Sequence, residues 1–183
     1  MGNQQERLLS LDWAAGLIQG EAHFGFLTWQ RRKDSMVFFP VFQISMKDEW
    51  AINRLKDILV ENGIPVTIPR APSLQKAGMY RIIIRGHGRL TRLLEVMMPR
   101  LGGDKKKSAQ FVQDFLESRT GKPKASPYSP SEVALVIASR EFNQPRTASH
   151  KDPLRALKNP KRGPKSRVRS SETNTLSAAT PRR

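Results

Sequence analysis

The sequence has no cysteine among its 183 residues. This absence excludes disulfide bonds, thiol catalysis and zinc sites built from cysteine. The chain also lacks a run of about 18 apolar residues, so we expect no transmembrane helix. Residues 1–11 lack the positive region and apolar run of a secretory signal, and no clear transit segment is present. We therefore expect a bacterial cytoplasmic protein, with an organelle as the alternative location.

Acidic residues are few. Lys and Arg total 32 against 16 Asp and Glu, which gives a net charge of +16 at pH 7. An excess of this size predicts a surface that attracts a polyanion. Nucleic acid is the expected partner, and an anionic membrane is the main alternative. The three histidines are scattered without metal-site spacing, and we interpret them as surface or structural residues.

The large apolar residues are concentrated between residues 8 and 119. We predict a folded domain over 8–119, a linker with a short helix over 120–142, and a basic tail over 143–183. Ser129 and Glu132 have capping-box spacing with Pro130 at the first helical position, which predicts a helix from about 130 to 141. The tail has too few core-forming residues to offset its ordering entropy, so we predict that it is disordered. Its lysines and arginines over 158–169 are either part of a simple disordered end or an arm that follows DNA phosphates.

Hydrophobic periodicity predicts helices and hairpins rather than a parallel sheet. The expected order is a helix over 8–20, strands over 23–30 and 37–44, a helix over 49–62, strands over 66–70 and 79–85, and helices over 89–98 and 105–119. Asp48 has the position of an N-cap and Gly63 that of a left-handed C-terminal cap. Because hairpins join the strands, we predict an α+β fold with an antiparallel sheet.

Two glycines lie four residues apart on one face of the first helix. Gly16 and Gly20 each cost about 1 kcal/mol of helix stability relative to Ala, so two in one turn need a reason. The best explanation is close packing against another helix, which the small flanking residues Ala14 and Ala15 also favour. The contact is either with a second copy of the chain or within one chain.

Glu21 follows at the C-terminal end of this helix. The helix dipole is negative there, which is unfavourable for a carboxylate. A carboxylate at this position indicates a cation nearby, although an exposed acid without a function is the simpler alternative. Asp12 lies too early in the helix to share this end, and we interpret it as a surface residue.

Residues 13–24 (WAAGLIQGEAHF) resemble the helix-to-strand motif of LAGLIDADG homing endonucleases. The resemblance continues in order over about residues 8–119. Residues 42–45 (FQIS) resemble the end of the family's second strand, and residues 80–84 (YRIII) resemble its fourth. Residues 99–101 (PRL) with the lysines at 105–107 are similar to the family's basic segment before its late helix.

This resemblance implies an αββαββα unit, two copies of which form a saddle-shaped sheet over duplex DNA. The dimer interface would contain Ala15, Gly16 and Gly20. Glu21 matches the family's metal-binding acid, so it would bind Mg²⁺ or Mn²⁺ for phosphodiester hydrolysis. Lys105 is the best match to the active-site lysine, with Lys106 and Lys107 as alternatives. Gln43 matches a polar catalytic position near the end of the second strand.

Three positions depart from the family's pattern. Gln19 stands where the family often has an acid, and Ala22 stands where the motif ends in Gly. Met46 aligns with a glutamine thought to order water near the site, a task that its thioether cannot perform, although Lys47 could substitute. These departures concern catalysis and leave the predicted fold unaffected.

Strand alternation indicates which sheet face meets DNA. If Phe24 and Phe26 point inward on the first strand, and Phe38, Phe42 and Ile44 on the second, the alternating residues form the DNA-binding face. The outward set is Gly25, Leu27, Trp29, Arg31, Val37, Phe39, Val41, Gln43, Arg81 and Arg85. We predict DNA contacts by Trp29, Arg31, Gln43, Arg70, Arg81, Arg85, Lys106 and Lys107. Apolar side chains can contact thymine methyl groups, and Arg can bind guanine.

Three functions follow from these observations. The first is a homing endonuclease that cuts double-stranded DNA at a long, roughly two-fold-symmetric site. The second is a catalytically inactive protein of the same fold, such as an intron RNA-splicing cofactor or a regulator. The third is a ribosomal or nucleoid-associated basic protein, which the glycine-bearing motif argues against, because binding by charge alone does not need it.

Overall fold

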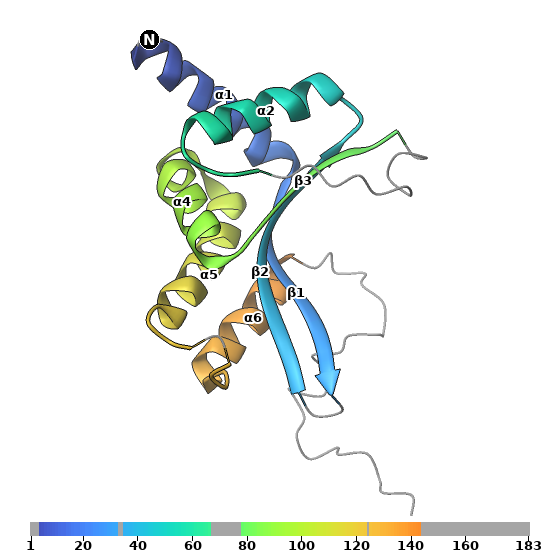
Figure 1. Ribbon diagram of the computed structural model, residues 1–183, viewed down its shortest axis with the longest axis vertical. Helices are drawn as coiled ribbons and strands as arrows, with labels where there is room; N and C mark the ends of the chain where they lie inside the picture. The colour runs from blue at the N-terminus through green and yellow to red at the C-terminus, as the bar shows by residue number, and fades with distance from the viewer. Residues whose placement is uncertain (1–3, 33–34, 67–77, 124, 144–183) are drawn as a thin grey trace, which may run out of the picture. The chain divides into compact units, whose positions relative to one another are not determined.

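The computed structural model describes residues 4–32, 35–66, 78–123 and 125–143. All of them belong to one compact unit, residues 1–148. Figure 1 shows its elements, which run in the order α1 (Gln4–Glu21), β1 (Ala22–Arg32), β2 (Ser35–Met46), α2 (Glu49–Glu61), β3 (Tyr80–Arg85), α4 (His87–Met97), the 3-10 turn η1 (Met98–Arg100), α5 (Gly103–Arg119) and α6 (Pro130–Asn143). No helix among the described residues is long and apolar enough to cross a membrane.

The three described strands form an antiparallel sheet in the order β1-β2-β3. Phe24 of β1 pairs with Phe42 of β2, and Ile44 of β2 pairs with Ile82 of β3. The predicted α+β fold with an antiparallel sheet is therefore confirmed. The strand predicted over 66–70 lies almost entirely outside the described residues, and so do Arg70 and the basic tail.

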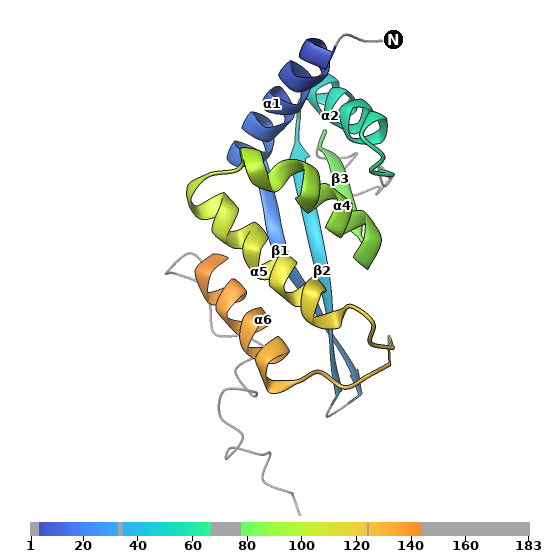
Figure 2. The same cartoon turned by 90° about the vertical axis from the view of Figure 1, so that its left-hand side faces the viewer.

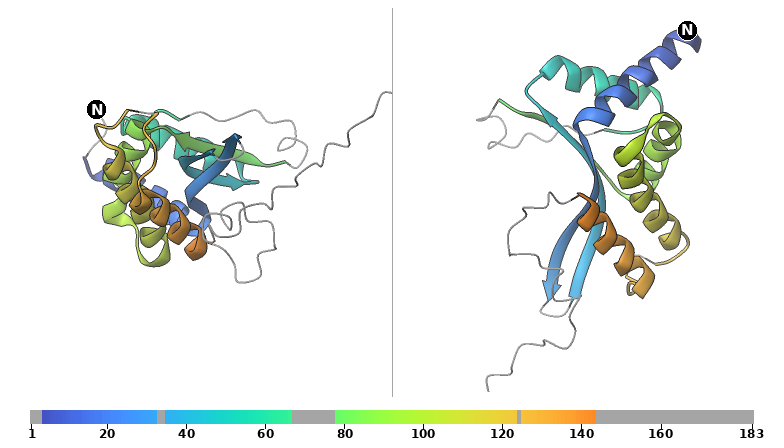
Figure 3. Two further views of the ribbon diagram at one scale, coloured as in Figure 1. Left: turned by 90° about the horizontal axis from the view of Figure 1, so that it is seen from below. Right: turned by 180° about the vertical axis from the view of Figure 1, so that it is seen from behind.

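Helices cover one face of this sheet. Figure 2 shows α4, α5 and α6 in front of the strands, and no described helix lies on the opposite face in the views of Figure 3. The covered face supplies the core through five fully buried side chains: Phe24, Phe42, Ile44, Ile82 and Ile84. Burying each such side chain contributes about 1.5–3 kcal/mol. Helix residues that complete the core include Ile18, Ile52, Leu55, Leu90 and Val112.

The alternation predicted for the strands is confirmed for most positions. Trp29 is 69% exposed, and Leu27 and Phe39 are exposed as well. Gly25 and Val41 are the exceptions, because both are buried although they belong to the outward set. The two residues pair with each other across β1 and β2, and Val41 also pairs with Arg85 of β3.

Local sequence signals determine the ends of α2. The Asp48 carboxylate accepts a hydrogen bond from the Ala51 N–H at 3.0 Å, as an N-cap does. Past the other end, Gly63 has a φ of +77°, a left-handed conformation that glycine adopts without a Cβ clash. The N–H of Ile64 then donates to the carbonyl of Leu59 at 2.9 Å, which closes the helix end.

The helix predicted after residue 129 forms, and its capping box is present. The Ser129 N–H donates to the Glu132 carboxylate at 2.6 Å, and the Glu132 N–H donates to the Ser129 hydroxyl at 3.3 Å. The helix belongs to the same compact unit as the other elements, and it packs against α5 and β1. At its end, Asn143 donates to the Phe24 carbonyl at 3.0 Å and accepts from the Ser108 hydroxyl at 2.8 Å.

Candidate functional site

The end of α1, the start of β1 and the first turn of α5 meet at one place. Glu21 is the last residue of α1 and is exposed, and Ala22 begins β1. The Lys105 ammonium of α5 donates a hydrogen bond to the Ala22 carbonyl, across 83 residues of sequence. The structure thus brings Glu21 and Lys105 together. Lys106 and Lys107 are exposed, and neither side chain has a hydrogen bond or ion pair with another described residue.

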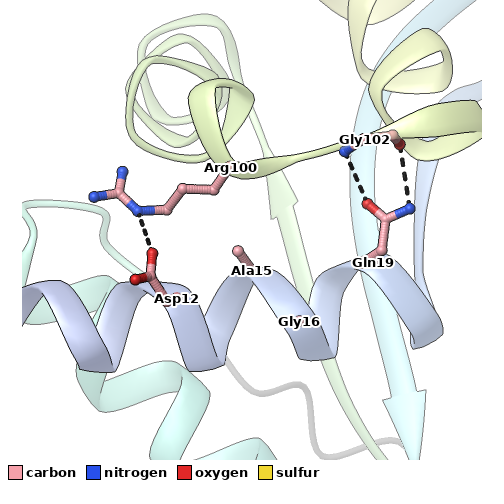
Figure 4. Close-up of a pocket in the computed structure, with 6 residues that line it drawn as sticks. All are labelled: Asp12, Ala15, Gly16, Gln19, Arg100 and Gly102. Atoms are coloured by element: carbon pink, nitrogen blue, oxygen red, sulfur yellow. Dashed lines mark hydrogen bonds and ion pairs between the residues drawn. The ribbon is translucent and has the colours of Figure 1, made fainter.

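Lys105 reaches this place because the loop before α5 is attached to α1. Figure 4 shows the Gln19 side chain facing the backbone of Gly102, the N-cap residue of α5. The Gln19 amide donates to the Gly102 carbonyl at 3.2 Å and accepts from the Gly102 N–H at 3.1 Å. A carboxylate could accept but not donate, so the departure from the family's acid at this position has a structural use. An ion pair of 3.0 Å between Arg100 and Asp12 makes a second attachment between the same two segments, nearer the N-terminus of each.

The local charges around Lys105 have opposing effects. Partial burial lowers the pKa of the Lys105 ammonium, and the nearby Glu21 carboxylate partly offsets this by favouring the charged form. Partial burial also lowers the pKa of the His23 imidazole, and the positive charge of Lys105 lowers it further. These effects link Glu21, His23 and Lys105 into one cluster.

The remaining polar candidates lie on the uncovered face of the sheet. Gln43 of β2 pairs directly with His23 of β1. Arg81 donates from Nε to the Ser45 hydroxyl at 2.8 Å, and Arg85 is exposed at the end of β3. Arg31 lies on β1, but its side chain is outside the described residues.

The glycine face of α1 is open. A Cβ added at Gly16 or Gly20 would meet nothing within 4 Å, and both residues are exposed. Leu9 and Trp13 continue the same face and are also exposed. Ala15, by contrast, is 4% exposed and lies in the wall of an open groove beside this face. The groove is lined by Asp12, Ala15, Gly16, Gln19, Arg100 and Gly102 (Figure 4).

No single chain supplies a complete metal site among the residues that the structure describes. They contain no group of three or more His, Cys, Asp and Glu side chains that could hold a metal ion. Glu21 is one hard oxygen donor at an exposed helix end. That donor suits Mg²⁺, which binds through one or two carboxylates together with waters and substrate phosphates.

Sequence reasoning missed two parts of this site. Sequence reasoning predicts a surface or structural role for His23, although its place two residues after Glu21 at the start of a strand is a usable signal. The pairing of Gln19 with Gly102 had no signal in the sequence, because its partners are 83 residues apart.

No family model matches the chain, and no curated protein matches it in sequence. Solved structures do. The homing endonuclease I-CvuI, in complex with its target and in the presence of calcium, is 15% identical with a TM-score of 0.62, over 80% of this chain and 90% of that one. The archaeal intron-encoded homing endonuclease I-Vdi141I, complexed with DNA, is 14% identical with a TM-score of 0.62, over 81% and 92%.

A longer protein matches through part of its length. The LAGLIDADG homing endonuclease I-LtrWI, bound to target DNA, is 13% identical with a TM-score of 0.62, and the match covers 82% of this chain but 49% of that one. The likeness therefore extends to proteins about twice as long as the matched region. Together with the sheet, the α1 motif and the position of α5, these matches show that the chain has the fold of the LAGLIDADG homing endonucleases.

Proposed function

We propose that this protein is a divalent-metal-dependent DNA endonuclease that works as a homodimer. One observation carries the proposal. The exposed Glu21 carboxylate and the Lys105 ammonium lie close together at the end of α1, next to the open face formed by Gly16 and Gly20. The proteins with this fold that were named above are homing endonucleases, two of them solved with DNA as the bound partner. The partner proposed for this chain is double-stranded DNA.

The homodimer follows from the two apolar sides of α1. Leu11, Ala14 and Ile18 are buried within the chain, whereas Leu9 and Trp13 are exposed beside the two open glycines. A helix that is apolar on all sides is normally buried on all sides. The exposed residues 9, 13, 16 and 20 have the spacing of a helix–helix seam, and small residues there allow close approach. A second copy of α1 would bury this exposed apolar side and pack closely at the glycines. It would also place two Glu21 carboxylates near one another.

Each residue of the proposed site has a distinct task. Glu21, one from each copy, would hold Mg²⁺ or Mn²⁺ together with phosphate oxygens of the substrate. The bound metal would lower the pKa of a water molecule and stabilise charge on the phosphate. Lys105 would offset the negative charge that develops on the phosphate. Gln43, opposite His23 on the uncovered face, lies where its amide can orient a water molecule or the DNA backbone.

The uncovered sheet face would receive the duplex. Arg81 and Arg85 would contact phosphates or guanine, and the exposed Trp29 would contact the groove. Arg31, Arg70, Lys106 and Lys107 remain proposed contacts of the duplex. Intron RNA is a further proposed partner under the alternative function.

One observation favours a catalytically inactive binding protein as the alternative. Met46 aligns with a water-ordering glutamine of the family, and here it packs against the hydrophobic core. Its thioether cannot order a catalytic water. In this alternative the protein would bind DNA or intron RNA as a splicing cofactor or regulator without cutting it.

Cleavage of a library of duplex sites with Mg²⁺ separates these functions. The wild type should produce double-strand breaks, and Glu21→Gln should abolish them while still binding DNA. Glu61→Gln is the matched control, because Glu61 is likewise the last residue of an exposed helix end, that of α2. Binding without any cleavage by the wild type, in Mg²⁺ or Mn²⁺, would leave the alternative as the function.

A further inference from the structure

His23 lies on the uncovered sheet face, two residues beyond Glu21. It is half-buried in β1, opposite Gln43 of β2, and the charge of Lys105 acts on it. Its neighbours on both sides are therefore residues of the proposed active site. The matches to known proteins and the motif assign no task to it.

A glycine next along the same face makes room for this imidazole. A Cβ built on Gly25 would lie 2.6 Å from Nε2 and 3.1 Å from Cε1 of His23. Real Cβ atoms do not approach that closely, so the ring occupies the space that any other residue at position 25 would fill. The His23 ring therefore lies along the strand toward the middle of the uncovered face.

The ring nitrogens have no partner among the residues that the structure describes. No hydrogen bond joins the His23 imidazole to any of them. An imidazole that lies against Gly25 and whose nitrogens have no protein partner among these residues can form a hydrogen bond with a ligand. The adjacent Lys105 ammonium makes an anionic ligand favourable at this place.

We propose that His23 is a DNA-contacting residue, whose imidazole, seated over Gly25, donates a hydrogen bond to a phosphate oxygen of the bound duplex. This inference rests on the proposed function, because it needs DNA on the uncovered face. Phosphate is the ligand chemistry that matches a nitrogen donor beside an ammonium group. Such contacts hold the DNA backbone in register and do not read sequence.

Four variants test this, with binding measured by fluorescence anisotropy on a labelled duplex. Since phosphate contacts are sequence-independent, any duplex serves as the probe. His23→Ala should weaken binding by about tenfold, the effect of losing one hydrogen bond to a charged group. His23→Gln, which keeps an N–H donor, should recover part of it. Gly25→Ala should weaken binding like His23→Ala, because the new methyl group displaces the ring. His87→Ala, which removes an exposed histidine at the start of α4, should bind as the wild type does.

The double variant His23→Ala/Gly25→Ala gives the sharpest result. If Gly25 acts only by seating the imidazole, the double variant should bind no more weakly than His23→Ala alone. An additive loss, or wild-type binding by His23→Ala, would overturn the proposal. If His23→Ala fails to fold, His23→Leu replaces it as the single variant and in the double variant. Leucine keeps the bulk of the side chain and removes the N–H donor.

The outcome also separates this inference from the proposed function. Wild type that binds the duplex but never cuts it contradicts the nuclease and leaves the His23 contact to be decided by the binding data. Wild type that does not bind duplex DNA overturns both. Wild type that cuts, with His23→Ala binding normally, overturns the His23 contact alone.

Discussion

The side chain of Gln19 and the backbone of Gly102 exchange two hydrogen bonds, which join the end of α1 to the N-cap of α5. Three residues beyond Gly102, Lys105 contacts the carbonyl of Ala22. The position of the proposed active-site lysine thus depends on an amide in the motif helix. The amide of a glutamine side chain can donate one hydrogen bond and accept another at the same time, as this contact requires.

Gln19→Ala should therefore loosen α5 from α1. We expect the free energy of unfolding to fall by about 1 kcal/mol, the small value of exposed hydrogen bonds, and DNA cleavage to fall with it. Urea unfolding and single-turnover cleavage measure the two effects. Gln110→Ala is the control, since Gln110 is exposed in α5 and bonds only to Asp114 one turn away. Unchanged stability and cleavage in Gln19→Ala would show that the attachment has no importance.

Glu132 should make the free energy of unfolding depend on pH in the acidic range. Its carboxylate is fully buried, and burial alone would raise its pKa. The hydrogen bonds from Ser129 and Lys122, with the charges of Lys122 and Arg119, outweigh burial and hold the pKa below its usual value. The unfolded chain therefore takes up this proton first as the pH falls. The stabilising contribution is present above the unfolded-state pKa and is lost as the pH falls through the folded-state pKa.

We accordingly expect Glu132→Gln to lower the free energy of unfolding at pH 7 by about 2 kcal/mol, through lost hydrogen bonds to a charged group. The difference from wild type should shrink as the pH falls toward the folded-state pKa of Glu132. Urea unfolding across this range measures it, with Glu61→Gln as an exposed control. A difference that is constant with pH would contradict the assignment.

The contribution of the uncovered sheet face to DNA binding can be measured from the salt dependence of the affinity. Arg85→Ala should lower the slope of log affinity against log salt by about 0.9 if the side chain neutralises one phosphate. Arg92→Ala is the matched control, because Arg92 lies on α4 and pairs with Glu95. Equal slopes for the wild type and both variants would contradict binding of the duplex at Arg85 on the uncovered face.

Particular residues show how far the sequence allows such a structure to be predicted. Alternation along residues 22–32 and 35–46 identified the core side of the sheet, because hydrophobic burial alone decides it. The caps at Asp48 and Gly63 were equally local. The packing of α6 was not predictable, because the segment before it is rich in Pro, Ser and Lys and its contacts with β1 and α5 are distant in sequence.

The site was predictable only in part for the same reason. Glu21 stood out through its position at a helix end. Lys105, Lys106 and Lys107 could not be separated, because the glycines at 102 and 103 leave the register of the following helix open. In the structure the Lys105 side chain contacts the Ala22 carbonyl, 83 residues away in sequence, which supports Lys105 as the proposed lysine. The seating of His23 over Gly25 depends on a side-chain orientation that strand alternation does not specify.

The most direct test of the account uses the absence of cysteine. Gly20→Cys gives a chain with a single thiol, which can form a disulfide only with a second copy. Bridged cysteines have Cα atoms about 4.4–6.8 Å apart, a separation that the proposed packing of two α1 helices at their glycines permits. We predict rapid formation of a disulfide-linked dimer on mild oxidation, seen on a non-reducing gel, and slow formation for Gly88→Cys, an equally open glycine on α4. Equal and slow crosslinking of both variants, with and without duplex DNA, would contradict the dimer on which the proposed active site depends.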